Sequence, residues 1–169
     1  MTIAPPAGDT IRDVVALATA LHVTLVTAEL CTAGALATLI ADTPGAGDVF
    51  AGGFVTYAKT CKEAVLGVPA SLIQKETAVS AEVALEMARG ALRSCVLADV
   101  AVAVTCVGGP KADDDGNPVG LAHIAVCHRD GAFARATETY DGAPSKIRAA
   151  VIDDAVSLLR SFLSARTSR

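Results

Sequence analysis

Three short segments of the chain carry side chains that could do chemistry, and each follows a stretch predicted to be a β-strand. They are residues 27–34, 57–62 and 105–117. In an α/β sheet, ligands collect at the carboxyl ends of the strands, because helix N-termini and their unpaired N–H groups converge there. These three segments are therefore the candidates for a ligand site.

The first segment combines a carboxylate, a thiol, a hydroxyl and a flexible backbone at the start of a predicted helix. These groups belong to Glu29, Cys31, Thr32 and Gly34. A helix N-terminus carries partial positive charge and free N–H donors, so this place suits an oxyanion or a phosphate. From this segment alone, the plainer interpretation is an ordinary helix cap by Thr27 or Thr32.

The second segment pairs a phenol with an amine. Tyr57 and Lys62 are five residues apart across a strand-to-helix junction, so their side chains converge only if the turn folds back. A lysine whose pKa is lowered by partial burial, with a tyrosine hydroxyl nearby, could activate a hydroxyl nucleophile. The alternative is that Lys62 is a solvated charge, like Lys59 and Glu63, and that Tyr57 covers the core.

The third segment is a glycine-rich loop with an acidic run. Gly108 and Gly109 follow a buried strand, so their N–H groups could approach a ligand, or they could serve only the turn. Residues 113–115 are three consecutive aspartates without the alternating spacing of a calcium loop, which favours a solvated loop. The three histidines have no acidic or cysteine neighbours at ligand spacing, and we predict no metal site.

The elements that position these segments follow from the apolar pattern. We predict strands over 23–27, 52–58, 99–105, 119–128 and 132–139, helices over 10–22, 31–41, 59–65, 69–74 and 80–95, and a last helix opening at 142–144. Residues 99–105 (DVAVAVT) are typical of a central strand buried on both faces. The Asp130-Gly131 pair between two extended runs indicates a β-hairpin.

Strand–helix alternation followed by a hairpin predicts an α/β fold of three layers, α/β/α, with a mixed and mostly parallel sheet. The length of 169 residues fits one domain. We place that domain at residues 9–165 and treat 1–8 and 166–169 as flexible termini.

Composition excludes several function classes. The net charge is −4 and the sequence contains no run of Lys or Arg. Both features argue against nucleic-acid binding. The longest apolar stretch, 14–28, is interrupted by polar residues and falls short of the roughly 20 that a spanning helix needs. The first eight residues lack the pattern of a signal peptide, so we expect a cytoplasmic protein.

The cysteines and the hydropathy add two expectations. None of the five cysteines belongs to a C-x-x-C pair, and five is an odd number, which favours reduced thiols over a disulfide frame. The mean hydropathy of +0.48 without a membrane segment suggests that a partner subunit covers apolar surface. We therefore expect a homo-oligomer.

Several separate motifs occur in a fixed order along the chain. They read TAELCTAG at 27–34, DTPGAGDVFAGGFVTYAKTCKEAVLGV at 42–68, AVS at 78–80, AVAVTCVGGP at 101–110 and NPVGLAHIAV at 117–126. Together they closely resemble the CinA C-terminal domain family over roughly residues 9–163. The family includes stand-alone nicotinamide-nucleotide amidases and domains fused to a larger N-terminal partner, and the chain resembles a stand-alone domain.

The resemblance implies an α/β/α domain of anticodon-binding-domain-like topology. It also implies a pyridine nucleotide as ligand: hydrolysis of the carboxamide of nicotinamide mononucleotide gives nicotinate mononucleotide and ammonia, in pyridine-nucleotide salvage. The implied mechanism uses a serine nucleophile assisted by a tyrosine and a lysine, with no cofactor. Those assisting positions match Tyr57 and Lys62. We expect the substrate to contact Glu29, Leu30, Thr32, Ala33, Gly34, Thr105, Gly108, Gly109 and Arg148.

The chain departs from the family pattern at the predicted site. The family loop reads T-A-E-S-C-T-G-G, whereas Leu30 stands here in place of the serine and Ala33 in place of the first glycine. Leu has no atom that can attack a carbonyl, and its bulk would occupy the space of the scissile amide. Cys106 stands for a glycine and Pro144 for an arginine, although Arg148 matches a second arginine.

Three interpretations stay open. In the first, the domain has lost amidase activity and survives as a module that binds a ligand or a protein partner, or it acts on another ligand. In the second, Cys31 or Thr32 supplies the nucleophile and the domain is an amidase. In the third, it is a purely structural partner domain that binds no small molecule.

Overall fold

The computed structural model describes residues 10–167. Its elements in chain order are α1 (Thr10–Leu21), β1 (Leu25–Glu29), α2 (Ala35–Ala41), the short 3-10 helix η1 (Ala46–Asp48), β2 (Phe50–Val55), α3 (Lys59–Leu66), α4 (Ala70–Glu76), α5 (Ala81–Ser94), β3 (Val100–Cys106), β4 (Leu121–His128), β5 (Phe133–Thr139) and α6 (Pro144–Thr167). The predicted alternation of strands and helices is confirmed.

The strands form one five-stranded sheet in the order β2-β1-β3-β4-β5. β1 is parallel to both β2 and β3, whereas β3–β4 and β4–β5 are antiparallel pairs. The prediction of a mixed sheet is confirmed, but "mostly parallel" is not exact, since two of the four strand pairings are parallel and two are antiparallel. No helix lies between β3 and β5, and strands joined by loops alone return antiparallel because a parallel neighbour needs a longer crossover.

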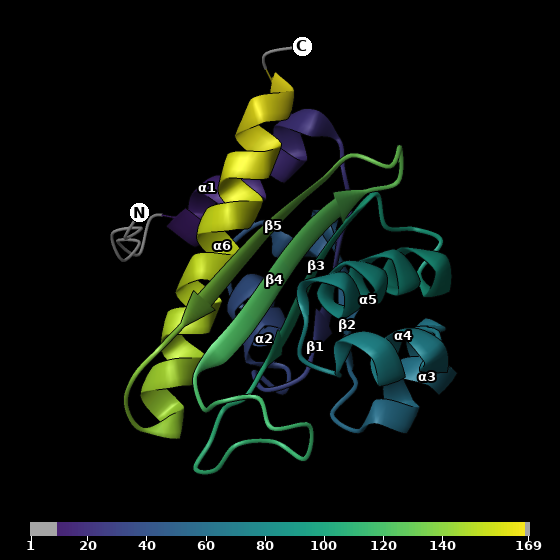
Figure 1. The fold of residues 1–169 in the computed structure, drawn as a ribbon. Helices are drawn as coiled ribbons and strands as arrows, with labels where there is room; N and C mark the ends of the chain where they lie inside the picture. The colour runs from purple at the N-terminus through teal and green to yellow at the C-terminus, as the bar shows by residue number, and fades with distance from the viewer. Residues whose placement is uncertain (1–9, 168–169) are drawn as a thin grey trace.

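Two groups of helices cover the two faces of this sheet (Figure 1). Helices α1, α2 and α6 pack on one face, and α5 packs on the other beside α3 and α4. Side chains alternate between faces along β3: Val100, Val102 and Val104 join the first core, and Ala101 and Ala103 join the second. The three-layer α/β/α architecture is confirmed.

Helix α3, which carries Lys62, lies in close contact with α5. A Cβ added to Gly90 of α5 would lie 2.1 Å from the carbonyl oxygen of Leu66, at the end of α3. Only a residue without a side chain permits this approach. Arg93 of α5 also donates to the same Leu66 carbonyl at 3.0 Å, so two residues of α5 contact the end of α3.

The ends of several elements differ from the predicted ones. Residues 31–34 form a turn rather than helix, and α2 begins only at Ala35. Helix α6 runs to Thr167, with Arg166 paired to Asp130 at 2.6 Å, so residues 166 and 167 are helical rather than frayed. The predicted flexible residues 1–8 and 168–169 lie outside the described residues. No helix within 10–167 is long and apolar enough to cross a membrane.

Candidate functional site

A cavity of about 480 Å³ opens at the carboxyl ends of β1 and β3, which is a size typical of small-molecule sites. Its walls come from the loop after β1, the β2–α3 junction, the segment before α5 and the loop after β3. The lining residues are Leu30, Tyr57, Ala58, Lys59, Ala78, Val79, Cys106, Val107, Gly108, Gly109, Lys111, Asp113, Asp114 and Asp115. The three segments singled out by sequence therefore meet at one place.

Leu30 lies on the wall of this cavity. Its side chain is half-buried and also packs against the core that α1, α2 and α6 cover. Its backbone N–H donates to the carbonyl of Val104 at 3.0 Å, which fixes the loop against the end of β3. The position that carries the family serine thus faces the cavity with a hydrocarbon side chain.

Glu29 has a structural task. Its buried carboxylate accepts hydrogen bonds from the backbone N–H groups of Gly34, Leu36 and Ala37 at 2.9, 3.1 and 2.9 Å, and from the hydroxyl of Thr27 at 3.1 Å. These N–H groups form the start of α2. The place that the sequence suggested for an oxyanion or phosphate is therefore filled by the protein's own carboxylate, and neither Thr27 nor Thr32 caps the helix.

The rest of the turn has a backbone conformation that favours glycine. Ala33 and Gly34 have φ angles of +50° and +95°, the left-handed region that favours glycine. Ala33 adopts it at a cost of about 1 kcal/mol. The hydroxyl of Thr32 is buried and has no hydrogen-bond partner among the described residues, and Thr32 does not line the cavity.

Tyr57 and Lys62 occupy different environments. Tyr57 is exposed and lines the cavity. Lys62 is fully buried, and its Nζ donates to the carbonyl of Thr56 at 2.7 Å. Burial lowers the pKa of Lys62 from 10.5 to about 8, so the neutral amine is accessible near physiological pH. The alternative of a solvated Lys62 is wrong.

Lys62 nevertheless lies close to the altered loop. The N–H of Thr56 donates to the carbonyl of Glu29 at 2.9 Å, so the backbone that Lys62 contacts is paired with the residue before Leu30. The hydroxyl of Thr56 is buried without a partner among the described residues. Lys62 is thus a desolvated amine close to a loop that has a leucine at position 30.

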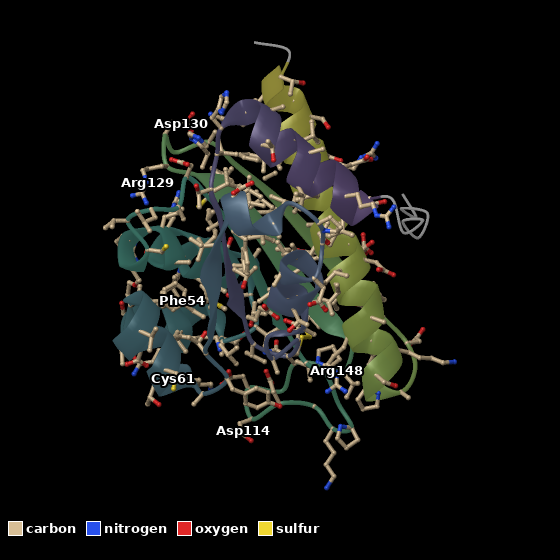
Figure 2. All side chains as sticks on the ribbon, turned by 180° about the vertical axis from the view of Figure 1, so that it is seen from behind. Phe54, Cys61, Asp114, Arg129, Asp130 and Arg148 are labelled. Carbon is tan, nitrogen blue, oxygen red and sulfur yellow. A yellow bond between two sulfur atoms is a disulfide. The ribbon has the colours of Figure 1, made fainter. Side chains whose placement is uncertain are left out.

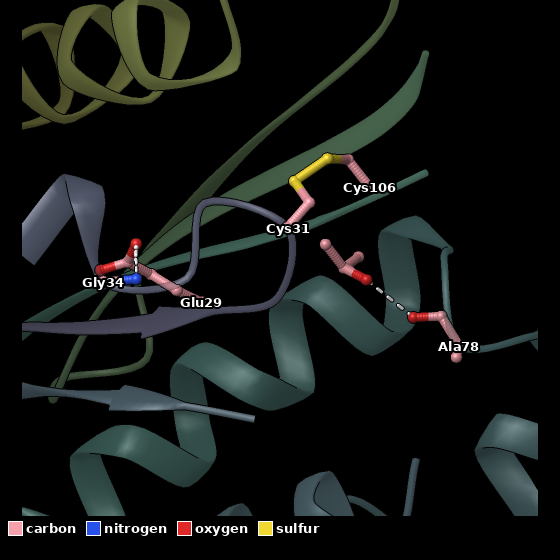
Figure 3. The surroundings of a disulfide bond; sticks show 6 residues. Glu29, Cys31, Gly34, Ala78 and Cys106 are labelled. Carbon is pink, nitrogen blue, oxygen red and sulfur yellow. Dashed lines mark hydrogen bonds between the residues drawn. A yellow bond between two sulfur atoms is a disulfide. The ribbon is translucent and has the colours of Figure 1, made fainter. Parts of the chain in front are cut away.

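Cys31 and Cys106 form a disulfide with a Cα–Cα distance of 5.7 Å (Figure 3). The prediction of reduced thiols is wrong for this pair, and Cys31 in a disulfide cannot act as a nucleophile. Sequence spacing gave no warning because 75 residues separate the two cysteines. The parallel register explains the pairing: Glu29 faces Val104, so the residues two further along face each other.

The loop after β3 is tied to both neighbouring walls. Asp115 pairs with Lys59 at 2.6 Å and accepts from the N–H of Ala78 at 3.3 Å, and the Lys59 ammonium lowers the pKa of Asp115. Thr105 is buried and donates to the carbonyl of Ala78 at 2.8 Å, a bond drawn in Figure 3. The acidic run predicted as a solvated loop therefore helps to shape the cavity.

Arg148 does not line the cavity, and it lies on α6, whose first turn contacts the glycine loop. A Cβ added to Gly109 would lie 3.7 Å from the ring of Pro144, which places the first turn of α6 against the glycine loop. Arg148 is one turn further on the same side of the helix and is exposed. Figure 2 shows Arg148 and Asp114 at one end of the molecule and Arg129 and Asp130 at the other.

Four of the predicted site residues line the cavity: Leu30, Tyr57, Gly108 and Gly109. The others do not line it, namely Glu29, Cys31, Thr32, Ala33, Gly34, Lys62, Thr105 and Arg148. The sequence interpretation missed the basic residues Lys59 and Lys111, although both lie in or next to the segments that follow strands. Within residues 10–167 no group of three His, Cys, Asp or Glu side chains could hold a metal.

Comparison with known proteins places this geometry in context. The family model for the CinA C-terminal domain matches residues 9–163. A CinA-like protein of Synechococcus sp. (strain RCC307) is 42% identical over 139 residues, which are 81% of this chain and 33% of that protein. One from Geotalea daltonii is 39% identical over 160 residues, 94% of this chain and 38% of that protein. The chain thus spans about a third of the length of these curated relatives.

Solved structures agree with the fold. The competence/damage inducible protein of Agrobacterium tumefaciens superimposes with a TM-score of 0.87 at 33% identity, covering 96% of this chain and 99% of that one. The competence damage-inducible protein A of Klebsiella pneumoniae superimposes with a TM-score of 0.88 at 29% identity, covering 93% and 96%.

Proposed function

We propose, from the premise that this chain belongs to the CinA C-terminal domain family, that its cavity binds nicotinamide mononucleotide without hydrolysing it. The observation that carries this proposal is Leu30 on the cavity wall at the family's serine position. Binding would use the inherited pocket, and the missing hydroxyl would stop the chemistry.

The cavity offers groups that match each part of a pyridine nucleotide. The exposed ring of Tyr57 can stack on the cationic pyridinium. Lys111 on the wall can attract the phosphate, with the exposed Arg148 of α6 as a second cation. The backbone of the glycine loop, Gly108 and Gly109, can approach the ligand closely because no side chain stands in the way.

Hydrolysis of a carboxamide needs a nucleophile at its carbonyl carbon and a proton for the departing ammonia. Leu30 supplies neither. Cys31 is bonded to Cys106, and the hydroxyl of Thr32 is buried away from the cavity. The amine of Lys62 remains available as a base but has no hydroxyl at position 30 to deprotonate.

A second candidate function, the amidase itself, is favoured by two side chains. Lys62 keeps a pKa of about 8, and Thr32 on the adjoining loop has a buried hydroxyl without a hydrogen-bond partner among the described residues. If the loop turned Thr32 into the cavity, these two groups would form a hydroxyl nucleophile and its base. In that case ammonia release would disappear in Lys62→Ala.

Melting temperature and ammonia release, measured on the same sample, test the proposal. We expect nicotinamide mononucleotide to raise the melting temperature while no ammonia forms at high protein concentration. Ammonia release that depends on Lys62 would replace the proposal by the amidase. If the nucleotide neither raises the melting temperature nor releases ammonia, the interpretation as a structural partner domain is favoured.

We also propose that the protein works as a homo-oligomer in the cytoplasm, where pyridine nucleotides are found. Val96 and Leu97, between α5 and β3, are 81% and 75% exposed and offer apolar surface to a second copy. Light scattering after size-exclusion chromatography tests this point, and a monomer at micromolar concentration would contradict it.

A further inference from the structure

We propose that Cys31 and Cys106 are a reversible redox-modification site that opens onto the ligand cavity. Small-molecule thiols and disulfides would interconvert its two states through Cys106, and the bond would set how firmly two cavity walls are joined. The part that concerns ligand affinity rests on the proposed nucleotide binding, whereas the redox chemistry does not.

The pair is built by the sheet rather than by a mobile segment. The parallel pairing of β1 and β3 ends at Glu29 and Val104, and both cysteines lie two residues beyond it. Their Cα–Cα distance of 5.7 Å falls within the range of natural disulfides. The remaining cysteines do not compete for this bond: Cys61, Cys95 and Cys127 are free thiols elsewhere in the fold.

The cavity gives a reagent access to one of the two sulfurs. Both cysteines are nearly buried, with 5% of Cys31 and 2% of Cys106 exposed. Cys106 nevertheless lines the cavity, whereas Cys31 does not. A thiol small enough to enter the cavity therefore reaches Cys106 first.

The exchange can be written in full. A small thiolate RS⁻ attacks the Cys106 sulfur, the S–S bond breaks, and Cys31 leaves as a thiolate that takes up a proton. A second RS⁻ then attacks the R-bearing sulfur, which forms R–S–S–R and releases the Cys106 thiolate to be protonated. Oxidation is the reverse, with a low-molecular-weight disulfide accepting the two electrons and becoming two thiols.

The bond joins the two walls that differ most from the family pattern. Cys31 follows Leu30 directly, and Cys106 ends β3 immediately before the loop that contains Val107 and Gly108. A Cβ added to Gly108 would lie 3.6 Å from the Cβ of Cys31, so the two loops are in contact beside the disulfide. Reduction would leave this contact without its covalent link.

The fold itself does not depend on the bond. Backbone hydrogen bonds from Leu30 to Val104 and from Val107 to Leu121, at 3.0 and 2.9 Å, hold the same strand ends. Reduction should therefore loosen the loops locally and leave the sheet intact. A pre-ordered wall binds ligand more tightly than a loose one, so the oxidised form should have the higher affinity.

Ligand and reductant compete for the same cavity, so ligand binding and reduction of the disulfide affect each other. A nucleotide in the cavity covers Cys106 and should slow its reduction. Because coupling between two sites is reciprocal in free energy, a ligand that prefers the oxidised form also stabilises the disulfide.

Thiol counting under denaturing conditions tests the redox site without any ligand. After treatment with glutathione disulfide, a polyethylene-glycol maleimide should label three cysteines, and after reduced glutathione it should label all five. Cys106→Ala should show four in both states. Cys61→Ser, the matched control at an exposed free thiol, should lose one label in both states yet keep the difference of two. Five labels after oxidation in the unmodified protein would overturn the proposal.

The melting temperature tests whether the disulfide stabilises the folded protein. The oxidised protein should melt at a higher temperature than the reduced one, and Cys106→Ala should match the reduced form and ignore oxidant. If this variant does not fold, the two forms of the unmodified protein still give the comparison. Equal melting temperatures would overturn the claim that the bond joins the walls.

The ligand arm uses nicotinamide mononucleotide as the probe. At saturation it should slow reduction by glutathione at least about 5-fold, and its affinity should be about 5-fold higher for the oxidised form. Binding with an unchanged reduction rate would contradict the route through the cavity. If the nucleotide binds neither form, the proposed function fails, while the thiol counts and melting temperatures still decide the redox site.

Discussion

The two sides of the cavity have opposite chemical character. On the α3 side, Tyr57 and Lys59 are exposed to the cavity and Lys62 is held behind them as a desolvated amine with a pKa of about 8. On the side of the β1 and β3 loops, Leu30 is a hydrocarbon and Cys31 is bonded to Cys106. The first side carries titratable groups, whereas Leu30 and the disulfide on the second side offer no free hydroxyl or thiol.

This difference shows that two walls of one cavity can differ in chemical character although the same ordered loops and strands support both. Glu29 still caps α2 with three backbone hydrogen bonds, so the altered loop is not collapsed. The hydrocarbon side chain of Leu30 thus stands in an ordered loop. Substitutions on either side of the cavity test this difference.

The largest expected effect is on the loop side. Leu30→Ser would place a hydroxyl at the cavity wall near the Lys62 amine and should raise ammonia release from nicotinamide mononucleotide on the order of 1,000-fold above background, equivalent to about 4 kcal/mol. Leu30→Ala opens the same space without a nucleophile and is the matched control. Equal rates in the two variants would mean that the lysine side no longer supports catalysis.

The next effect is on the α3 side and concerns pH. Lys62 loses its proton near pH 8 in the folded protein but near 10.5 when unfolded, so between these values the unfolded state holds more protons. Raising the pH from 8 to 10.5 should therefore increase the free energy of unfolding by about 3 kcal/mol from this group. Urea titrations across that range measure it.

Lys62→Met should remove that increase, because the neutral side chain does not titrate. Lys146→Met, at an exposed lysine, serves as the control and should leave the increase in place. A slope that persists in Lys62→Met would show that Lys62 is not the desolvated group.

A smaller effect is expected at Glu29, whose carboxylate holds the loop after β1 against the start of α2. Glu29→Gln keeps the size of the side chain but removes the charge that three N–H groups contact, which should lower the free energy of unfolding by about 2 kcal/mol. Glu138→Gln, at an exposed position, should change it by less than about 0.5 kcal/mol. Denaturant titration distinguishes them, and equal midpoints would contradict the capping role.

The smallest expected effect is on the ion pair that joins the two sides. Lys59 and Asp115 are 2.6 Å apart but their side chains are 45% and 23% exposed, so Asp115→Asn should cost less than about 1 kcal/mol. High salt should reduce the difference in the free energy of unfolding between Asp115→Asn and the unmodified protein. A larger loss, unaffected by salt, would mean that the loop depends on Asp115 in another way.

Much of the fold could be predicted from local patterns. The β-hairpin followed from Asp130-Gly131, and Ser80 caps α5 by accepting from the N–H of Val83 at 3.3 Å, as its position before an apolar run suggests. The share of parallel pairing was overestimated, because the pairing of β4 with β3 depends on how the loop after β3 returns rather than on the strand residues.

The site was predicted less completely, for reasons of tertiary structure. The loop that carries Leu30 was found from its place after a strand, but the disulfide was not, since only the β1–β3 register brings Cys31 to Cys106. Likewise, sequence gives no sign that the helix start near Gly34 is already occupied by Glu29. Lys62 became informative only once its burial was known.

Saturation-transfer nuclear magnetic resonance on nicotinamide mononucleotide with the unmodified protein tests the central claim most directly, since one spectrum reports both contact and conversion. We predict transfer to the pyridinium and ribose protons, with the nucleotide signals unchanged in position and intensity over hours. Appearance of nicotinate mononucleotide signals, or the absence of any transfer, would contradict a cavity that binds this nucleotide and leaves it intact.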